Sequence, residues 1–314
     1  SIRKAIEQSS YSNACKELLN IQVDLAATGK IAMTDRELKS AYIAVNKLNR
    51  EKANEYFSNT HIDIPEGYYD ILKEFTSINT LKALYSRQYA STIYLISFMP
   101  NYRKILKETL GTNQGPLFDY IRFNELYHSI KDFIPLTADQ EIEIKKLSSP
   151  AYTEMLTQTN KETIKKIELN KRKSGFTINE AGEVSNEDLF PSILSKFRGH
   201  TLLVDIWATW CGPCRMANKA IAPMKEELKE KDIIYLYITG ETSPKGTWEN
   251  MISDIHGEHF RVTNEQWNFL MSNLNIEGVP TYFIIDSEGN ITYKKTGFPG
   301  VETMKKQLLK TLSK

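Results

Sequence analysis

A Cys-x-x-Cys pair at the junction of a predicted strand and a predicted helix constrains this sequence more than any other feature. Cys211 and Cys214 follow an apolar run at residues 201–207 and precede a long helical pattern. A helix that begins at the pair exposes the first sulfur at its N-terminus and turns the second inward, within bonding distance. The unpaired amides and the dipole of the first turn stabilise a thiolate at Cys211, the reactive form of a cysteine. Gly212 allows close approach of another chain, and Pro213 has the backbone angle of a first helical turn.

Two other interpretations of the pair deserve comparison with redox chemistry. A Cys-x-x-Cys can be half of a zinc site, and His256 and His259 supply two nitrogen ligands further along the chain. A purely structural disulfide is the second alternative, although so short a loop constrains the unfolded chain weakly. We favour a redox pair, because a proline between the cysteines and a strand before them suit that chemistry. We therefore expect no metal site.

Strands alternate with helices after Gly175, which predicts a mixed sheet covered by helices. Apolar runs bounded by turn residues predict the strands, and apolar residues at three- and four-residue spacing predict the helices. The last two strands are predicted to form a hairpin. The predicted strands are residues 176–178, 201–207, 233–238, 260–262, 282–286 and 291–294, and the predicted helices are residues 186–197, 211–229, 248–255, 264–274 and 301–312.

Residues 1–172 have a helical pattern without strand alternation, and the spacing of the prolines predicts about six or seven helices. Thr34 starts a capping-box pattern, and Gly29 just before it suits a left-handed helix end. Aromatic residues recur at helical spacing, as at Tyr94 and Phe98. A peptide-binding groove and interhelical packing both explain them. We favour packing, because periodic apolar residues usually form a core.

Length and charge limit the domain organisation and the partners. A chain of 314 residues can bury about two cores, because domains run roughly 100 to 200 residues. We therefore expect an all-α domain of unassigned role at residues 1–172 and a second domain at residues 173–314. The formal net charge of +1 favours neither nucleic acid nor an anionic membrane. No feature of the sequence sets an oligomeric state.

The first residues of the chain lead to an expectation about its natural start. It begins with Ser1 rather than Met, and the next residues are amphipathic rather than a basic end followed by an apolar block. We expect that the natural start, with any signal peptide or lipid anchor, was removed. The longest apolar run, residues 93–99, is far shorter than the ~20 residues that cross a bilayer.

The segment around the cysteines resembles the active-site segment of thioredoxin. The resemblance covers residues 204–215, which read VDIWATWCGPCR. Residues 278–281, Gly-Val-Pro-Thr before a predicted strand, are similar to the cis-proline loop of that superfamily. An extra helix and strand before this loop make residues 174–314 similar to the TlpA/ResA-like branch. The resemblance implies an α/β thioredoxin fold, with a mixed central sheet flanked by helices and a TlpA/ResA-like insertion, preceded by the all-α domain.

The resemblance also implies a role for residues near the pair. Cys211 would be the nucleophile that forms a mixed disulfide, and Cys214 would be the resolving thiol. Asp205 matches the buried carboxylate that assists proton transfer at the resolving cysteine, and its alternative is an edge aspartate that faces water. Trp210 would shield the sulfurs and offer a flat docking surface, with a core tryptophan as the alternative. Gly212 and Pro213 would support the geometry of the pair.

The predicted cis-proline loop would dock the substrate. Pro280 in cis would lie against the disulfide and leave the backbone of Val279 free to pair with a substrate strand, with Thr281 completing the docking segment. A trans turn proline is the alternative. One departure concerns the helix: the family has a proline five residues after the second cysteine, where this chain has Lys219, and Pro223 follows four residues later. The departure affects helix packing and leaves the chemistry intact.

The residues between the cysteines favour one direction of electron flow. Gly-Pro is the thioredoxin dipeptide, which belongs to the reducing end of the scale, so the favoured function is a protein-disulfide reductase. A thiol oxidase often has a histidine between the cysteines, which this chain lacks; a disulfide isomerase is the other alternative within this chemistry. A redox-responsive binding protein that works through the helical domain is the third hypothesis. The Cys211–Cys214 disulfide would be the redox centre, without a further cofactor.

The resemblance finally implies a compartment and partners. It implies a bacterial protein of the periplasm, outside the cytoplasm, anchored through a removed N-terminal segment; a cytoplasmic location is the alternative. The expected partners are client proteins with disulfides and a membrane electron donor of the thiol-reducing type. Cys15, the third cysteine, is expected to lie buried on the first helix.

Overall fold

The chain divides into two compact units, and neither is a continuous stretch of sequence. The computed structural model describes residues 2–60, 64–182 and 184–313. The first unit combines Ser1–His128 with Leu136–Thr157, and the second combines Ser129–Pro135 with Gln158–Lys314. Each unit has its own buried apolar core. The predicted domain border between residues 172 and 173 stays a prediction.

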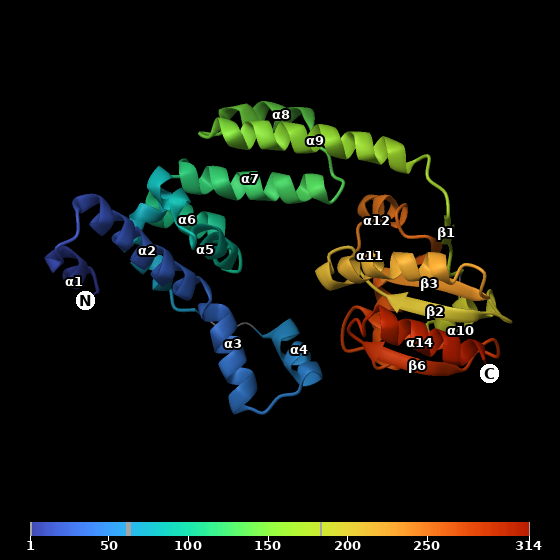
Figure 1. The fold of residues 1–314 in the computed structure, drawn as a ribbon. Coiled ribbons are helices and arrows are strands. Elements are labelled where there is room, and N and C mark those ends of the chain that lie inside the picture. The colour runs from blue at the N-terminus through green and yellow to red at the C-terminus, as the bar shows by residue number, and fades with distance from the viewer. Residues whose placement is uncertain (1, 61–63, 183, 314) are drawn as a thin grey trace. The chain divides into compact units, whose positions relative to one another are not determined.

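The described part of the chain before the sheet contains helices and no strands, as predicted (Figure 1). The prediction of six or seven helices was too low, because this part is divided into many short pieces, including three consecutive 3-10 helices. No helix in the described residues has both the length and the apolar character that crossing a bilayer requires. The elements are α1 (Ile2–Gln8), α2 (Asn13–Ala32), α3 (Thr34–Val45), α4 (Arg50–Asn59), η1 (Tyr68–Glu74), η2 (Thr76–Asn79), η3 (Leu81–Tyr85), α5 (Tyr89–Ile96), α6 (Tyr102–Leu110), α7 (Pro116–Lys131), α8 (Ala138–Glu143), η4 (Ile144–Lys146) and α9 (Pro150–Asn170).

Gly29 lies inside α2 and does not end a helix, which corrects the expectation from the sequence. A methyl group at Gly29 would lie 3.2 Å from Cδ1 of Leu95, on α5. The missing side chain therefore lets α2 and α5 pack closely, and the buried side chains of Leu25 and Ile93 belong to the core that they share. Cys15 is half-buried in the first turn of α2, so the expectation that it lies buried on the first helix was wrong.

Thr34 is the first residue of α3 and does not cap it. Met33 occupies the cap position, without a side-chain cap bond from any described residue. The hydroxyl of Thr34 lies 2.7 Å from the hydroxyl of Tyr68. The hydroxyl that the local pattern assigned to the helix cap therefore contacts a distant segment of the chain instead.

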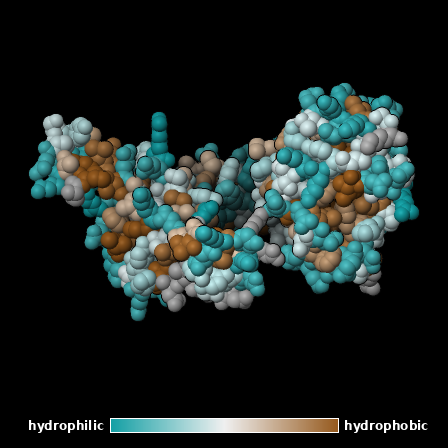
Figure 2. All heavy atoms as spheres, turned by 90° about the horizontal axis from the view of Figure 1, so that it is seen from below, coloured by the Kyte–Doolittle hydropathy of each residue, from teal (hydrophilic) through white to brown (hydrophobic). Residues whose placement is uncertain are grey.

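The aromatic side chains of the first unit divide between core and surface. Tyr89 and Phe123 are buried, and the ring of Phe123 stacks on that of Tyr152 with 4.6 Å between the centroids. In contrast, Tyr85 is 85% exposed and Tyr94 is 64% exposed. Figure 2 shows apolar side chains at the surface among hydrophilic ones. Packing therefore explains part of the aromatic pattern.

The second unit contains a six-stranded mixed sheet with helices on both faces. The strand order is β1-β4-β3-β2-β5-β6, with parallel pairing from β1 to β2 and antiparallel pairing of β5 with its two neighbours. The predicted strands and helices are confirmed, and their ends differ by at most three residues. The elements are β1 (Phe176–Asn179), α10 (Leu189–Ser195), β2 (Thr201–Ile206), α11 (Gly212–Glu227), β3 (Ile233–Gly240), α12 (Lys245–Ile252), β4 (Gly257–Val262), α13 (Asn264–Asn273), β5 (Thr281–Ile285), β6 (Ile291–Thr296) and α14 (Val301–Leu312).

The central strand β2 sends alternate side chains to the two faces of the sheet, as strand geometry requires. Val204 and Ile206 join the core that contains α10 and α13. Leu203 joins the opposite core, together with side chains of α11 and α14. Asp205 shares the face of Leu203 and therefore lies on the α11 side of the sheet. Figure 1 shows α11 running across β2 and β3.

Helix α12 is hydrogen-bonded to two segments that precede the sheet in the sequence. Oγ1 of Thr247 donates to the carbonyl oxygen of Asp132 at 2.7 Å. Nδ2 of Asn170 donates to the carbonyl oxygen of Asn250 at 3.1 Å. All four residues belong to the second unit. That unit therefore includes chain from well before its first strand.

We expect Gly257→Ala to lower the free energy of unfolding by about 2 kcal/mol. Gly257 opens β4 with φ of 138°, a region that favours glycine. An added Cβ would lie 2.4 Å from the carbonyl oxygen of Tyr235 in the neighbouring strand. Guanidinium unfolding measures the change. The matched control is Gly246→Ala in α12, where nothing lies within 4 Å of the added carbon, so stability should stay equal or rise. Equal stabilities of the two variants would contradict the steric argument.

Candidate active site

Cys211 caps the N-terminus of α11, and Cys214 lies one turn inside the helix. After β2 ends at Ile206, Cys211 takes an extended conformation and the helix begins at Gly212. The amide of Cys214 donates to Sγ of Cys211 at 3.1 Å, and the two sulfurs form a disulfide. Cys214 is fully buried, whereas 4% of Cys211 is exposed. A thiolate formed at Cys211 on reduction would be stabilised by this amide and by the positive end of the helix dipole.

The surface beside Cys211 includes an exposed aromatic side chain. The side chain of Trp210 is 60% exposed, and its Nε1 donates to Oγ1 of Thr242 at 3.2 Å. The alternative of a core tryptophan is therefore wrong. Gly212 and Pro213 form the first turn of α11 and are also exposed. Small residues on one side and an indole face on the other leave room for a polypeptide to approach the disulfide.

The loop before β5 lies against the cysteine pair. The peptide bond between Val279 and Pro280 is cis, and Sγ of Cys211 lies 3.7 Å from the carbonyl oxygen of Val279. Thr281 is fully buried, and its hydroxyl donates to the carbonyl oxygen of Gly278 at 2.7 Å. The side chain of Thr281 therefore holds the shape of the loop. Val279 is half-buried, so its backbone is the part of the expected docking segment nearest to both solvent and sulfur.

Asp205 lies in the middle of β2 with 1% of its surface exposed, so the alternative of an edge aspartate is wrong. The strand register pairs it with Tyr237 on β3 and with Tyr282 on β5. No described residue donates a hydrogen bond to either carboxylate oxygen. Burial raises the pKa of Asp205 well above its ordinary value, and the positive charge of Lys225 opposes this only in part. The carboxyl group therefore keeps its proton to a higher pH than an exposed aspartate does.

Lys225 is a residue of the site that the sequence did not reveal. It extends from α11, and its Nζ donates to the hydroxyl of Tyr237 at 3.0 Å and to the carbonyl oxygen of His256. Burial lowers the pKa of Lys225 to about 8, although Asp205 favours its charged form. The sequence does not indicate that this lysine of the helix, rather than another, is buried. Its environment arises only when β3 and the segment before β4 come together under α11.

The two histidines of the zinc alternative have separate environments. His256 is exposed, whereas His259 is buried in β4. Nε2 of His259 lies 2.7 Å from the carbonyl oxygen of Ile255, and its ring stacks on that of Tyr237 with 4.8 Å between the centroids. Burial lowers the pKa of His259 to about 4, so the ring is neutral at pH 7. Within the described parts of the chain, no three His, Cys, Asp or Glu side chains are grouped to hold a metal ion.

Comparison with known proteins gives matches to the region that contains the pair. The Redoxin family matches residues 173–311. The thiol:disulfide interchange protein DsbE of Pseudomonas fluorescens biotype C is 29% identical over 100 residues, which cover 32% of this chain and 53% of that protein. The thiol-disulfide oxidoreductase ResA of Geobacillus kaustophilus is 26% identical over 116 residues, which cover 37% of this chain and 65% of that protein. The chain thus spans between 53% and 65% of the length of these two relatives.

The comparison with solved structures also gives a partial similarity. The crystal structure of StoA from Bacillus subtilis is 20% identical in sequence. The match covers 35% of this chain and 83% of that one, and its TM-score is 0.30.

Proposed function

Residues 173–311 form a TlpA/ResA-like domain of the thioredoxin superfamily, and from this premise we propose that the chain is a thiol-disulfide oxidoreductase that reduces protein disulfides. The observation that supports the proposal best is the position of the two sulfurs. Cys211 caps α11 and Cys214 is bonded to it from one turn inside the helix. One sulfur is then placed to attack a client and the other to release it.

The reduction proceeds in two exchange steps. The thiolate of Cys211 attacks one sulfur of a client disulfide; that S–S bond breaks, and the second client sulfur leaves as a thiolate that takes a proton. Cys214 then loses its proton and attacks Sγ of Cys211, which breaks the mixed disulfide and releases the client as a dithiol. Two electrons have passed to the client. The disulfide of Cys211 and Cys214 remains, for an external dithiol donor to reduce.

Asp205 is the group that we assign to the proton of Cys214. It is the buried acid on the α11 side of the sheet, and no described residue hydrogen-bonds its carboxylate. Burial raises its pKa above that of an exposed aspartate, which makes its carboxylate a stronger base. Trp210 and the backbone of Val279 would contact the client, because both border Cys211 and reach the surface.

The redox potential of the pair tests the direction of electron flow. Equilibration of the protein in dithiothreitol or glutathione buffers, followed by alkylation of free thiols, measures it. We expect a value near that of thioredoxin, about −270 mV, because the same Gly-Pro dipeptide separates the cysteines. A value of about −120 mV is typical of a strong oxidant. It would contradict the reductase proposal and favour a thiol oxidase.

We expect Pro213→His to make the pair more oxidising by about 30 mV or more. A histidine between the cysteines stabilises the thiolate of Cys211, and a tenfold stabilisation of the reduced form corresponds to about 30 mV for two electrons. The same buffer equilibration measures the shift. Lys231→His, at an exposed position outside the active site, is the control and should leave the potential unchanged. A potential that does not move in Pro213→His would indicate that the dipeptide does not set the redox poise.

The partners that we propose follow from the chemistry of the pair. Clients are proteins with accessible disulfides, and the donor is a membrane protein of the thiol-reducing type. We propose a location outside the cytoplasm, in the bacterial periplasm, where client disulfides persist. Immunoprecipitation of a Cys214→Ala variant from that compartment tests this, because clients should remain bound to Cys211 as mixed disulfides that dithiothreitol releases.

A further inference from the structure

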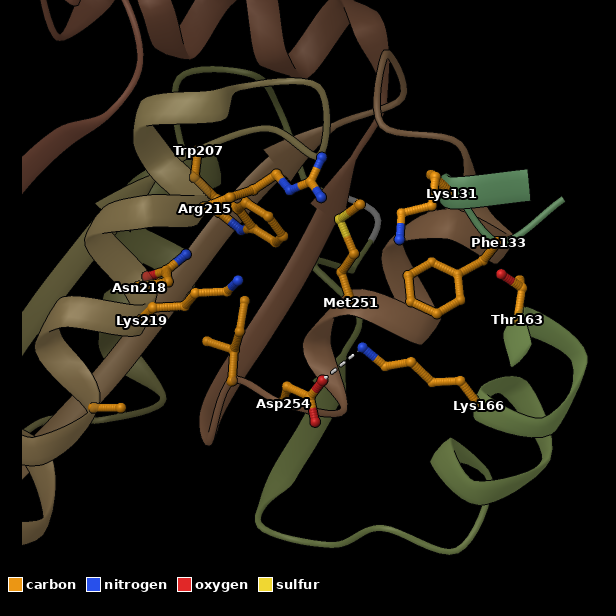
Figure 3. A pocket seen from close by; sticks show the side chains of 12 residues that line it. Lys131, Phe133, Thr163, Lys166, Trp207, Arg215, Asn218, Lys219, Met251 and Asp254 are labelled. Carbon is orange, nitrogen blue, oxygen red and sulfur yellow. Dashed lines mark ion pairs between the residues drawn. The ribbon is translucent and has the colours of Figure 1, made fainter. Parts of the chain in front are cut away.

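A cavity of about 460 Å³ lies beside α11 in the second unit. All of its lining residues belong to that unit, and the volume is in the range of small-molecule sites, roughly 300–1,000 Å³. Figure 3 shows Trp207, which follows β2, and side chains of α11 on one side of the cavity. On the other side lie side chains of α9, of the end of α12 and of the short segment after α7. The cavity is separate from the client surface formed by Trp210 and Val279.

The charge of the cavity wall is strongly positive. Lys131, Arg215 and Lys219 point their charged ends into the gap in Figure 3, and no described carboxylate pairs with any of them. The fourth cation, Lys166, pairs with Asp254 at 3.3 Å. Three uncompensated cations around one cavity attract an anion with more than one negative charge.

Two buried side chains present polar atoms that have no hydrogen-bond partner among the described residues. Asn218 is 9% exposed, and neither atom of its amide is hydrogen-bonded by a described residue. Trp207 is fully buried, and its Nε1 likewise has no acceptor among the described residues. Both line the cavity. A buried polar group without a partner costs free energy, so these two N–H donors indicate an acceptor supplied by a ligand.

Apolar side chains also line the cavity. They include Phe133, Met251 and Ile255. Phe133 has φ of 62°, in the left-handed region that an aromatic residue rarely adopts, and its ring lies 5.3 Å from Nζ of Lys166. An apolar body therefore fits between cationic groups at the edges.

We propose that this cavity binds a small organic dicarboxylate with an apolar body. One carboxylate would accept hydrogen bonds from the guanidinium of Arg215 and Nε1 of Trp207, and the other would be neutralised by Lys131 and Lys219. The fork of an arginine matches a carboxylate. Trp207 also belongs to the apolar cluster that contains both cysteines, so the ligand is held next to the redox pair.

Calorimetric titration of the oxidised protein with phthalate tests the proposal. Phthalate carries two carboxylates on an aromatic ring, and we expect saturable binding at one site that weakens as salt is added. Dimethyl phthalate, the neutral ester, should not bind, and inorganic phosphate should bind at least about tenfold more weakly because it lacks the apolar body. Absence of saturable phthalate binding, or equal binding of the ester or of phosphate, would overturn the proposal.

Variants of the wall separate ligand binding from a structural role. Lys219→Gln should weaken phthalate about tenfold, and the matched control Lys231→Gln, an exposed lysine outside the cavity, should not. Asn218→Leu should weaken binding while the melting temperature of the free protein stays equal or rises, because the amide has no hydrogen bond to a described residue that the substitution would remove. A lower melting temperature with unchanged affinity would assign Asn218 to the core alone. The titration needs no turnover, so its failure would leave the proposed reductase function untouched.

Discussion

Replacing Cys211 by serine is expected to lower the rate of disulfide reduction on the order of 1000-fold or more. The hydroxyl of serine does not ionise at neutral pH, so the first exchange step loses its nucleophile. The initial rate of insulin reduction in the presence of dithiothreitol measures the loss. Serine has nearly the size of cysteine, and only a short loop is closed by the native disulfide, so the fold should persist.

The remaining cysteines provide the controls for this experiment. Cys15→Ser should reduce insulin at the wild-type rate, because Cys15 lies on α2 in the other unit. Cys214→Ala should stop multiple turnover but still form one mixed disulfide on Cys211. Retention of a tenth or more of the activity in Cys211→Ser would rule out the proposed chemistry.

The second large effect is expected from Asp205→Asn, which should slow release of the mixed disulfide about 100-fold at pH 7. An amide cannot accept the proton that Cys214 must lose. Reduced protein mixed rapidly with an aromatic disulfide releases one coloured thiol when Cys211 attacks and a second when Cys214 resolves. Only the second release should slow. Asp286→Asn, at the half-buried position after β5, is the control and should leave both rates unchanged.

The same substitution should change stability with a definite dependence on pH. Burial raises the pKa of Asp205 in the folded protein above its value in the unfolded chain, about 3.9. The folded state then binds more protons than the unfolded state, so stability falls as pH rises from about 4 through the raised pKa. Asp205→Asn should therefore be more stable than wild type at pH 8, by about 1–3 kcal/mol, and the gain should vanish at pH 3.

Two other ionisable groups check the sign of this argument. The pKa of Lys225 is lowered to about 8, so between about pH 8 and pH 10.5 its contribution rises with pH and opposes that of Asp205. The carboxylate of Asp286 accepts hydrogen bonds from backbone amides, which lowers its pKa. Asp286→Asn should therefore lose stability at neutral pH. If Asp205→Asn gained stability without slowing the second thiol release, Asp205 would be structural rather than a base.

The strands of the second unit could be predicted because their sequence is almost continuously apolar. Residues 201–206 are buried on both faces of the sheet, and no other element accommodates such a run between turn residues. The helical unit was harder. Thr34 and Gly29 were assigned to a cap and a helix end from local patterns, but the hydroxyl of Tyr68 and the side chain of Leu95 determine their actual environments. Such contacts between distant segments produce no periodic pattern in the sequence.

The candidate site likewise contains residues that could be predicted from the sequence and residues that could not. Cys211, Cys214 and Asp205 lie within ten consecutive residues, and the apolar run and the helical pattern after it placed them on a strand and on the next helix. The resemblance to thioredoxin supplied the role of Asp205. Lys225 and Asn218 look like ordinary residues of an amphipathic helix. Their importance depends on which strands and loops lie under that helix, and this is a property of the folded chain.

The hydrogen bonds of α12 to Asp132 and Asn170 bear on how the gene can be divided. A reading frame that begins at residue 173 would encode every strand of the sheet but neither of these two partners. Residues 129–135, which hold one of them, lie between two parts of the helical unit. Recombination at the border of the sheet would therefore separate α12 from its supports, and the two units should be inherited as one block.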